Sequence, residues 1–385
     1  MFSNEQLNKF QSEETPFYYY DLSLLSATLK ACTTASDKYG FHVHYALKAN
    51  VDKRVLATIK SYNIGADCVS GGEVKRALEI GFNKNQIVFA GVGKSDAEIN
   101  FGLDNDIFCF NVESIQELEV INELAAKKGK TAQVALRINP NVNAYTHKYI
   151  TTGLEENKFG INQWEFDKVV TSLKSLPNIK CVGLHFHIGS QITDFNVFKS
   201  LCVKVNDIVK WFTDRGVAIK VINVGGGLGV DYYEPDSKSI VDFETYFKIF
   251  DSFLERTAQQ EVHFELGRAL VANSGALISK VLFVKNGQVT NFAILDAGMT
   301  ELMRPALYQA YHKIQNISKS GNSVKSKNYD VVGPICESTD CFGKAVELPE
   351  TQRGDLIAIR TAGAYGEVMA SNYNLRNKVN VVYGE

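Results

Sequence analysis

The sequence predicts an α/β protein built from a (β/α)8 TIM-like barrel and a mostly β C-terminal domain. Its 385 residues are more than one compact core usually holds, which indicates two domains. Between residues 22 and 268 a short β-branched run, a polar turn and a helical pattern alternate repeatedly, and after residue 268 this alternation stops. We therefore expect a barrel at residues 22–268 and a β-rich domain formed by residues 1–21 together with residues 269–385.

Eight short apolar runs in the first part are separated by segments with helical spacing. Strands that alternate with helices indicate a parallel sheet, and eight such units indicate a closed barrel. The expected strands are His42–Leu47, Ala66–Val69, Ile87–Ala90, Ile107–Val112, Val134–Ile138, Val182–Ile188, Val221–Val224 and Val262–Leu266. The clearest expected helices are Leu22–Tyr39, Gly72–Ile80, Glu113–Lys128, Val197–Thr213 and Val241–Ala258.

Strand-like runs dominate the second part, where helical periodicity is scarce. The stretch Phe17–Asp21 (FYYYD) has the same character, so we expect it to join this domain. The segment Ser318–Lys327 is expected to be a polar loop. The expected strands are Leu277–Val284, Phe292–Leu295, Tyr329–Val332, Asp355–Arg360 and Val379–Tyr383.

The composition is that of an ordinary globular protein, with 45% hydrophobic and 22% charged residues. A formal net charge of -2 provides no basic stripe for nucleic acid, so we expect a small-molecule or protein partner. The polar start lacks the apolar run of a signal peptide, and no stretch is long and apolar enough for a membrane span. Seven scattered cysteines are typical of reduced thiols, so we expect a cytoplasmic protein.

Polar side chains collect where several of the expected barrel strands end. Alternate residues of a strand share one face, which places Lys48 at the end of a face that begins with His42 and His44. Barrel enzymes carry their active sites at this carboxyl-terminal end, whereas purely structural polar groups should occur at both ends. The other polar groups and glycines at strand ends are Arg137, Asn139, His185, His187, Gly225–Gly227, Glu265 and Arg268.

Lys48, in HYALKAN, is the candidate for a Schiff-base lysine. A barrel wall can desolvate the amine, which lowers its pKa and frees it as a nucleophile. The structural alternative is an exposed lysine leaving the barrel mouth. The polar groups at the neighbouring strand ends favour the catalytic interpretation.

The run Val221–Gly229 (VINVGGGLG) is the candidate for an anion site. Successive glycines after a strand let backbone N–H groups approach an anion, and barrels often bind a phosphate after their seventh and eighth strands. One alternative is a tight turn. Another is a dinucleotide fingerprint, but the GxGxxG spacing is not met.

Residues at the sixth and eighth strands suit a flat cofactor. Glu265 could keep the ring nitrogen of such a cofactor protonated, and Arg268 could clamp a substrate carboxylate. His187 could cover the ring, and Ser190 could add a hydrogen bond to a phosphate. The structural alternatives are an internal ion pair between Glu265 and Arg268 and a buried histidine satisfied by backbone.

Paired histidines raise a rival interpretation. His42 and His44 on the first strand, with His185 and His187 on the sixth, resemble the metal centre of amidohydrolase barrels. That family requires a metal-binding aspartate at the end of the last strand, where this sequence has Glu265. We therefore keep a metal-dependent barrel hydrolase as a minor alternative and expect no metal.

Ten motifs in order over nearly the whole chain resemble the fold-type III pyridoxal-phosphate decarboxylases, which combine a barrel with an alanine-racemase-like β domain. Leu266 is a departure, because the family usually has proline there. The motifs are YALKAN, GADCVSGGE, LRINPNV, THKYITTGLEENKFG, GLHFHIGSQ, GGGLG, ELGR, DAGMTELMRPALY, CES and GAYG.

The resemblance implies that Lys48 binds the cofactor, pyridoxal 5'-phosphate, covalently and that His187 stacks on its ring. It implies that Glu265 pairs with the pyridinium, with Asp67 and Arg137 as supporting polar groups. The remaining cofactor contacts that it implies are Ser190, Gly226, Gly227, Gly267, Arg268 and Tyr365.

The resemblance also points to the substrate. Arg304 and Tyr308, in DAGMTELMRPALY, match the segment with which the diaminopimelate branch holds a second carboxylate. With Arg268 and Tyr365 they imply decarboxylation of meso-2,6-diaminopimelate to L-lysine and carbon dioxide. Related decarboxylases acting on ornithine, arginine or carboxynorspermidine are the alternatives, although an ornithine enzyme needs an acidic residue for the terminal amine.

The CES motif implies a homodimer with shared active sites. Cys336 and Glu337 resemble a loop that family members insert into the partner's site, where the cysteine protonates the substrate carbon and the glutamate binds its amine. Without this resemblance Cys336 would be interpreted as a buried structural thiol. A cofactor-binding protein without catalysis is a further alternative, which the intact Lys48, Cys336 and Tyr365 disfavour.

Overall fold

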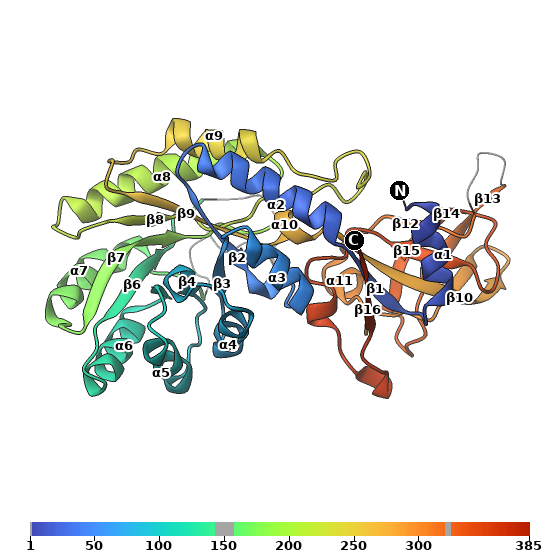
Figure 1. Ribbon diagram of the computed structural model, residues 1–385, viewed down its shortest axis with the longest axis horizontal. Helices are drawn as coiled ribbons and strands as arrows, with labels where there is room; N and C mark the ends of the chain where they lie inside the picture. The colour runs from blue at the N-terminus through green and yellow to red at the C-terminus, as the bar shows by residue number, and fades with distance from the viewer. Residues whose placement is uncertain (1, 143–157, 320–324) are drawn as a thin grey trace. The chain divides into compact units, whose positions relative to one another are not determined.

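The computed structural model describes residues 2–142, 158–319 and 325–385. These form two compact units (Figure 1). The barrel unit comprises residues 28–229 and 242–270, and the β-rich unit comprises residues 1–27, 230–241 and 271–385. The sequence prediction placed residues 22–27 and 230–241 in the barrel, whereas they belong to the β-rich unit, and it placed residues 269 and 270 in the β-rich domain, whereas they belong to the barrel unit.

The barrel unit contains a closed barrel of eight parallel strands in chain order, as predicted. The ends of each predicted strand lie within two residues of the ends of an observed strand, with one exception. The strand β7 begins at Ile179, three residues before the predicted start at Val182. The strands are β2 (His42–Ala46), β3 (Gly65–Cys68), β4 (Ile87–Phe89), β5 (Cys109–Val112), β6 (Ala132–Ile138), β7 (Ile179–Phe186), β8 (Val221–Asn223) and β9 (Glu261–Leu266).

Helices follow the barrel strands, and most begin at a side chain that caps the first turn (Figure 1). Ser70, Ser95 and Ser114 each accept a hydrogen bond from the backbone N–H three residues later, which satisfies an otherwise unpaired donor. Asp52 and Asp242 cap the helices that begin at Lys53 and Phe243 in the same way. The helices are α2 (Leu22–Asp37), α3 (Lys53–Ser61), α4 (Gly71–Ile80), α5 (Asp96–Asp104), α6 (Ile115–Lys127), α7 (Phe166–Ser175), α8 (Phe195–Thr213), α9 (Phe243–Phe253) and α10 (Arg268–Val271).

The β-rich unit is a mixed sheet in the order β12-β15-β10-β11-β13-β14, to which β1 is joined through β10, and β16 through β1. The predicted Phe17–Asp21 strand is β1, which runs antiparallel to β10 and parallel to β16. Phe10, Phe17 and Tyr19 pack with Ile278 and Val382 in its core. The further elements are α1 (Asn4–Ser12), β10 (Gly275–Asn286), β11 (Asn291–Leu295), α11 (Arg304–Tyr308), β12 (Ile314–Asn316), β13 (Ser326–Val332), β14 (Cys341–Pro349), β15 (Leu356–Ile359) and β16 (Asn380–Gly384).

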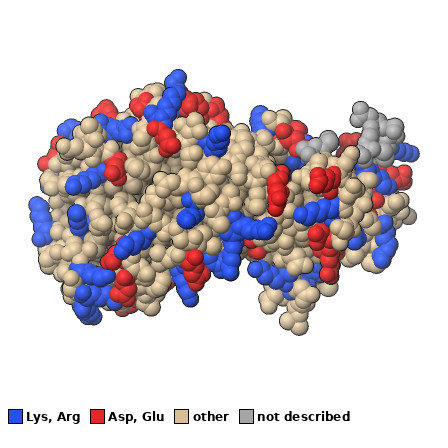
Figure 2. All heavy atoms as spheres, in the orientation of Figure 1, with Lys and Arg blue, Asp and Glu red and all other residues tan. Residues whose placement is uncertain are grey.

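The surface carries charges of both signs. Figure 2 shows lysine and arginine side chains interspersed with aspartate and glutamate on the face in view. Among the described residues, no helix has the length and apolar character that crossing a bilayer requires.

Candidate active site

Lys48 and Asp67 lie side by side at the carboxyl-terminal end of the barrel. Lys48 sits in a 3-10 turn, η1 (Leu47–Ala49), directly after β2, and Asp67 lies in β3. Lys48 Nζ is 3.9 Å from Asp67 Oδ2, with side chains 40% and 1% exposed. Neither carboxylate oxygen of Asp67 accepts a hydrogen bond from a described residue. Burial, followed by the charge of Glu265, raises the pKa of Asp67 well above its usual range, although Lys48 opposes this shift.

Glu265, in β9, has hydrogen-bond donors from three other strands. Its Oε1 accepts from Asn111 Nδ2 at 2.9 Å and from Asn223 Nδ2 at 2.8 Å. Its Oε2 accepts from His185 Nε2 at 2.9 Å. Burial opposes ionisation, but the charge and hydrogen bond of His185, together with Lys48, hold the pKa of Glu265 below its usual range. An ionised carboxylate has about four acceptor positions, so Oε2 retains room for one more donor.

Sequence reasoning assigned no role to Asn111, Asn223 or His185 as partners of Glu265. The available signal was a single polar residue within an apolar strand, as in FCFNVE and VINVGG. Asn223 also accepts a hydrogen bond from Gly225 N–H at 2.9 Å through its Oδ1. It therefore couples the carboxylate to the glycine run.

His187 follows β7 and lies against the glycine run. Its Nδ1 accepts a hydrogen bond from Gly226 N–H at 3.3 Å, so in the neutral ring the proton is on Nε2. Burial and the nearby charges of Lys48 and Arg137 lower the pKa of His187 well below its usual value. The ring is thus a neutral, flat surface beside the glycines, which suits the predicted stacking role.

The glycine run Gly225–Gly227 requires the absence of side chains. Gly225 and Gly227 have positive φ angles of 71° and 109°. A Cβ on Gly226 would lie 1.9 Å from the carbonyl oxygen of Glu265, and one on Gly225 would lie 2.2 Å from that of Phe186. The run is therefore fixed tightly against β7 and β9.

Ser190 and Arg268 meet beside this run. Arg268 follows Gly267 at the start of α10, and its Nη2 donates to Ser190 Oγ at 3.1 Å. Gly227 O accepts from Ile192 N–H at 2.8 Å, which ties the Ser190 segment to the glycines. A hydroxyl, a guanidinium and side-chain-free backbone at one place fit a phosphate group. Arg268 thus lies on the predicted phosphate side of the site.

Arg137 forms a buried ion pair, with its Nη1 2.7 Å from Glu113 Oε1. Glu113 Oε2 in turn accepts from Gly160 N–H at 2.9 Å. Arg137 is thus linked through Glu113 to the backbone at Gly160. The part of the THKYITTGLEENKFG motif that covers residues 146–157 lies outside the described residues.

The second substrate segment lies in the β-rich unit. Arg304, at the start of α11, is buried, and its Nη1 donates to Tyr232 Oη at 2.8 Å and to His312 Nε2 at 3.0 Å. His312 Nδ1 donates to the carbonyl of Arg360 at 2.8 Å, which fixes the His312 tautomer as an acceptor towards Arg304. Tyr308 ends α11 and is half-buried. Sequence reasoning did not identify Tyr232 and His312.

Cys336 and Glu337 are exposed in the loop between β13 and β14. The buried Asp340 anchors this loop by accepting from the backbone N–H groups of Ile335 at 2.7 Å and Met299 at 2.6 Å. Tyr373 Oη donates to Glu337 Oε1 at 2.9 Å. The predicted alternative of a buried structural thiol at Cys336 is therefore wrong.

Tyr365 is half-buried and has a φ angle of 56°, a left-handed conformation that is strained for a bulky residue. Such conformations concentrate at functional sites, where the surrounding structure maintains them. The next residue, Gly366, has no room for a side chain, since a Cβ would lie 2.5 Å from the carbonyl oxygen of Ala362. The backbone around Tyr365 is therefore closely determined.

The four histidines of the rival metal centre do not converge. His185 binds Glu265, His187 accepts from Gly226, and His44 Nε2 lies 2.8 Å from His263 Nδ1. Among the described residues, no group of potential metal ligands includes His185 or His187. The amidohydrolase-like arrangement is therefore not formed.

Known proteins match this chain along its length. The family described as "Pyridoxal-dependent decarboxylase, pyridoxal binding domain" matches residues 25–272. A diaminopimelate decarboxylase of Bacteroides thetaiotaomicron is 57% identical over 371 residues, which cover 96% of this chain and 95% of the relative. One of Helicobacter pylori is 41% identical, over 98% of this chain and 92% of the relative.

Solved structures agree with these relatives. The crystal structure of the H. pylori diaminopimelate decarboxylase complexed with L-lysine has a TM-score of 0.92 at 40% identity, covering 100% of this chain and 94% of that one. A diaminopimelate decarboxylase from M. jannaschii has a TM-score of 0.89 at 37% identity, covering 99% and 89%. Identity at this level over the full length of both chains shows more than a shared fold. The chain belongs to the diaminopimelate decarboxylases, within the pyridoxal-dependent decarboxylase family.

Proposed function

We propose that this chain decarboxylates meso-2,6-diaminopimelate to L-lysine and carbon dioxide, with pyridoxal 5'-phosphate as its cofactor. The observation that carries the proposal is the grouping of Lys48, Asp67 and Glu265 inside one end of the barrel, beside a glycine run with Ser190 and Arg268. Membership of the family and the L-lysine complex of the H. pylori relative support the same substrate and product.

The described residues fit the cofactor. Lys48 would hold its aldehyde carbon, His187 would cover its ring, and the Gly225–Gly227 run with Ser190 and Arg268 would hold its phosphate. The buried carboxylate of Asp67 has no donor among the described residues, which is expected where a ligand completes the site. When bound, pyridoxal phosphate supplies an electron sink for the electron pair left as carbon dioxide departs.

Glu265 sets the charge of this site. Because its three donors keep it ionised, its free acceptor position on Oε2 would receive a ring N–H and keep that nitrogen protonated. His185 and the two asparagines act as positioning residues. They orient the carboxylate before any ligand arrives, so no reorganisation is needed during the reaction.

Arg304 is the proposed contact for the distal carboxylate of the substrate. Tyr232 and His312 are neutral partners, so they orient the guanidinium without cancelling its charge. A planar guanidinium binds a carboxylate through two parallel hydrogen bonds. Ornithine and arginine have no carboxylate at the distal position, so they would not form this contact. Arg268, Tyr308 and Tyr365 complete the proposed substrate contacts.

We propose a homodimer in which the loop bearing Cys336 and Glu337 serves the partner's site. Cys336 would donate a proton from Sγ to the carbon that has lost carbon dioxide, and Glu337 would bind the substrate amine. The exposure of both side chains on a loop anchored by Asp340 supports a role outside their own surroundings. The seven free cysteines support a cytoplasmic location.

Substrate assays test the central proposal. Carbon dioxide release should be measured from meso-diaminopimelate, ornithine and arginine, and we expect turnover of the first alone. Lys48→Ala should lower turnover by about 10³-fold or more and abolish the cofactor's visible absorbance, because the nucleophilic amine is lost. Lys53→Ala, at an exposed position five residues away, is the matched control. Turnover of ornithine alone would overturn the substrate assignment.

Complementation tests the shared site. Lys48→Ala and Cys336→Ser proteins should each be inactive, whereas their mixture should recover about one quarter of the wild-type activity. Random association makes half of the dimers mixed, and each mixed dimer has one intact site of two. A mixture as inactive as its components would place Cys336 and Lys48 in the site of one subunit.

A further inference from the structure

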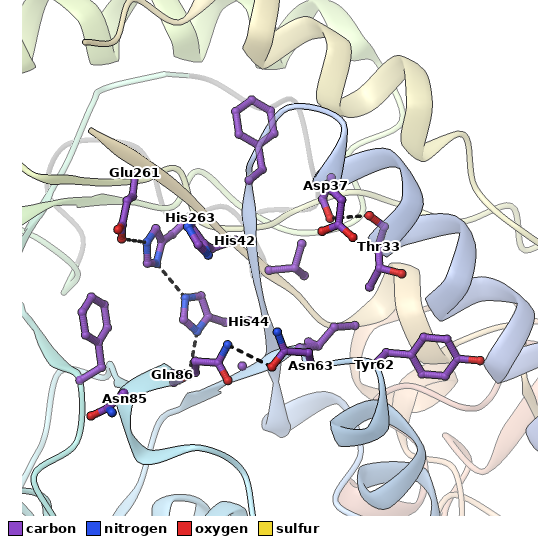
Figure 3. Close-up of a pocket in the computed structure, with 16 residues that line it drawn as sticks. Thr33, Asp37, His42, His44, Tyr62, Asn63, Asn85, Gln86, Glu261 and His263 are labelled. Atoms are coloured by element: carbon purple, nitrogen blue, oxygen red, sulfur yellow. Dashed lines mark hydrogen bonds and ion pairs between the residues drawn. The ribbon is translucent and has the colours of Figure 1, made fainter. Parts of the chain in front are cut away.

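A cavity of about 270 Å³ opens at the amino-terminal end of the barrel, where β2 and β9 begin (Figure 3). Lys48 follows the opposite end of β2, so this cavity lies at the other end of the strand from the proposed active site. None of the roles proposed above uses its polar lining. That lining includes His42, His44, Gln86, Glu261 and His263.

Three potential metal ligands converge in this cavity. The ligand atoms of His42, Glu261 and His263 all lie within 4.8 Å of one another. His42 and His263 are register partners on the paired strands β2 and β9, which holds their rings 4.8 Å apart between centroids. Figure 3 shows His42 and Glu261 on either side of the His263 ring. Two imidazoles and one carboxylate, with a further position open to solvent, form a common zinc ligand set.

The hydrogen bonds behind His263 fix which of its nitrogens bears a proton. The carbonyl of Gln86 can only accept, so His44 Nδ1, at 3.0 Å, donates to it. His44 is buried and its partners are a carbonyl and an imidazole, neither of which stabilises a second proton on its ring. Its Nε2 therefore accepts, and His263 Nδ1 donates to it at 2.8 Å.

The second ring nitrogen of His263 faces the carboxylate, since Nε2 lies 3.2 Å from Glu261 Oε2. With Nδ1 directed at His44, Nε2 is the His263 atom available to a metal ion. A metal ion that takes the place of the Nε2 proton would lie between the imidazole and the carboxylate, where the ring of His42 can also reach it.

We propose that His42, His263 through Nε2, and Glu261 bind a divalent transition-metal ion of the zinc class at this end of the barrel. The relay from His263 Nδ1–H through His44 to the Gln86 carbonyl resembles the outer hydrogen bonds that orient imidazole ligands. The ion joins the first strand of the barrel to the last, where the barrel closes. Its role is structural, because the reacting groups are at the other end of the strands.

Zinc titration of the intact, cofactor-loaded enzyme tests this proposal after dialysis against a chelator. We expect about one equivalent of Zn²⁺ to bind, with a higher Tm and unchanged carbon dioxide release. His42→Ala and Glu261→Gln should each weaken that binding at least 10-fold, whereas Asn85→Ala, which lines the same cavity but is not one of the three proposed ligands, should not. Co²⁺ in place of Zn²⁺ should give the visible absorbance of a four- or five-coordinate site in the wild type and in Asn85→Ala, but not in His42→Ala or Glu261→Gln.

Two results would overturn the proposal. One is the absence of stoichiometric Zn²⁺ binding to the wild type, which would leave only the hydrogen bond between His263 and Glu261 at this place. The other is undiminished binding by a folded His42→Ala protein, which would place the ion elsewhere. Decarboxylation is measured separately in each sample, so neither result bears on the proposed function.

Discussion

Two buried carboxylates in the same barrel have opposite surroundings. Glu265 is 7% exposed and accepts hydrogen bonds from His185, Asn111 and Asn223, whereas Asp67 is 1% exposed and accepts none from the described residues. Burial pushes the pKa of both groups upward, yet the charge and hydrogen bond of His185 reverse that effect at Glu265, whereas burial remains dominant at Asp67. Burial alone therefore does not determine whether a carboxylate in this barrel is ionised; the charges and donors around the carboxylate also decide it.

The two carboxylates therefore differ in whether their hydrogen-bond partners are present before the cofactor binds. The protein itself completes the surroundings of Glu265, so its negative charge is present before the cofactor binds. Asp67 has no hydrogen-bond donor among the described residues, so a ligand or the neighbouring amine of Lys48 would have to supply one. The following experiments test this contrast in order of expected effect.

Glu265→Gln should have the largest effect, lowering kcat by about 10²- to 10³-fold, because a neutral amide cannot hold a positive charge on the ring nitrogen. Carbon dioxide release from the cofactor-loaded protein measures it. Glu123→Gln, on the exposed surface of α6, is the control and should behave as the wild type. Retention of more than a third of the wild-type kcat by Glu265→Gln would show that the charge is dispensable.

His185→Ala should lower kcat by about 10- to 100-fold and move the acid limb of the kcat profile upward by about one pH unit or more. The hydrogen bond from His185 to the ionised carboxylate contributes about 1.5–3 kcal/mol, and its loss raises the pKa of Glu265. A pH–rate profile provides the measurement. His185→Gln, which restores a donor, should recover part of the shift; an unchanged acid limb in His185→Ala would remove His185 from this role.

Asp67→Asn should stabilise the cofactor-free protein by about 1–3 kcal/mol at pH 7, because an amide avoids the cost of an ionised group without donors. Glu265→Gln should destabilise the same form by a similar amount, since its donors lose their charged acceptor. Urea unfolding of both cofactor-free variants gives the two differences. If both substitutions changed the free energy of unfolding in the same direction, the proposed difference between Asp67 and Glu265 would be wrong.

The stabilisation by Asp67→Asn should also depend on pH. The folded-state pKa of Asp67 is raised, so folding favours its protonated form and wild-type stability falls as pH rises from the unfolded pKa of 3.8 towards the folded value. The variant cannot ionise, so its advantage should be small below about pH 4 and should grow above it. Unfolding curves at several pH values measure this; an advantage that shrinks with rising pH would reverse the assignment.

The sequence predicted the site residues whose position depends on a single strand. Lys48, His187 and Glu265 were found because each lies at the end of an apolar run, and the barrel places all such ends together. The partners of Glu265 could not be found this way. Asn111 and Asn223 meet it across the barrel interior, and that contact depends on the registers of several strands at once.

The same limit explains the errors in the fold prediction. The strand β14 was not predicted because its sequence, CFGKAVELP, carries lysine and glutamate and only partly buries its side chains, so it lacks an apolar pattern. Residues 230–241 were assigned to the barrel because they lie between two of its strands. Their contacts with the β-rich unit, such as Tyr232 with Arg304, join positions far apart in the chain.

The position of β1 has a consequence for synthesis of the chain. Tyr19 pairs with Ala276 on one side and with Val382 on the other, so this strand lies between partners that follow it by hundreds of residues in the chain. At about 5–20 residues per second, tens of seconds separate its synthesis from theirs. Throughout that time its tyrosine-rich edges lack these partners and are exposed to pairing with other chains.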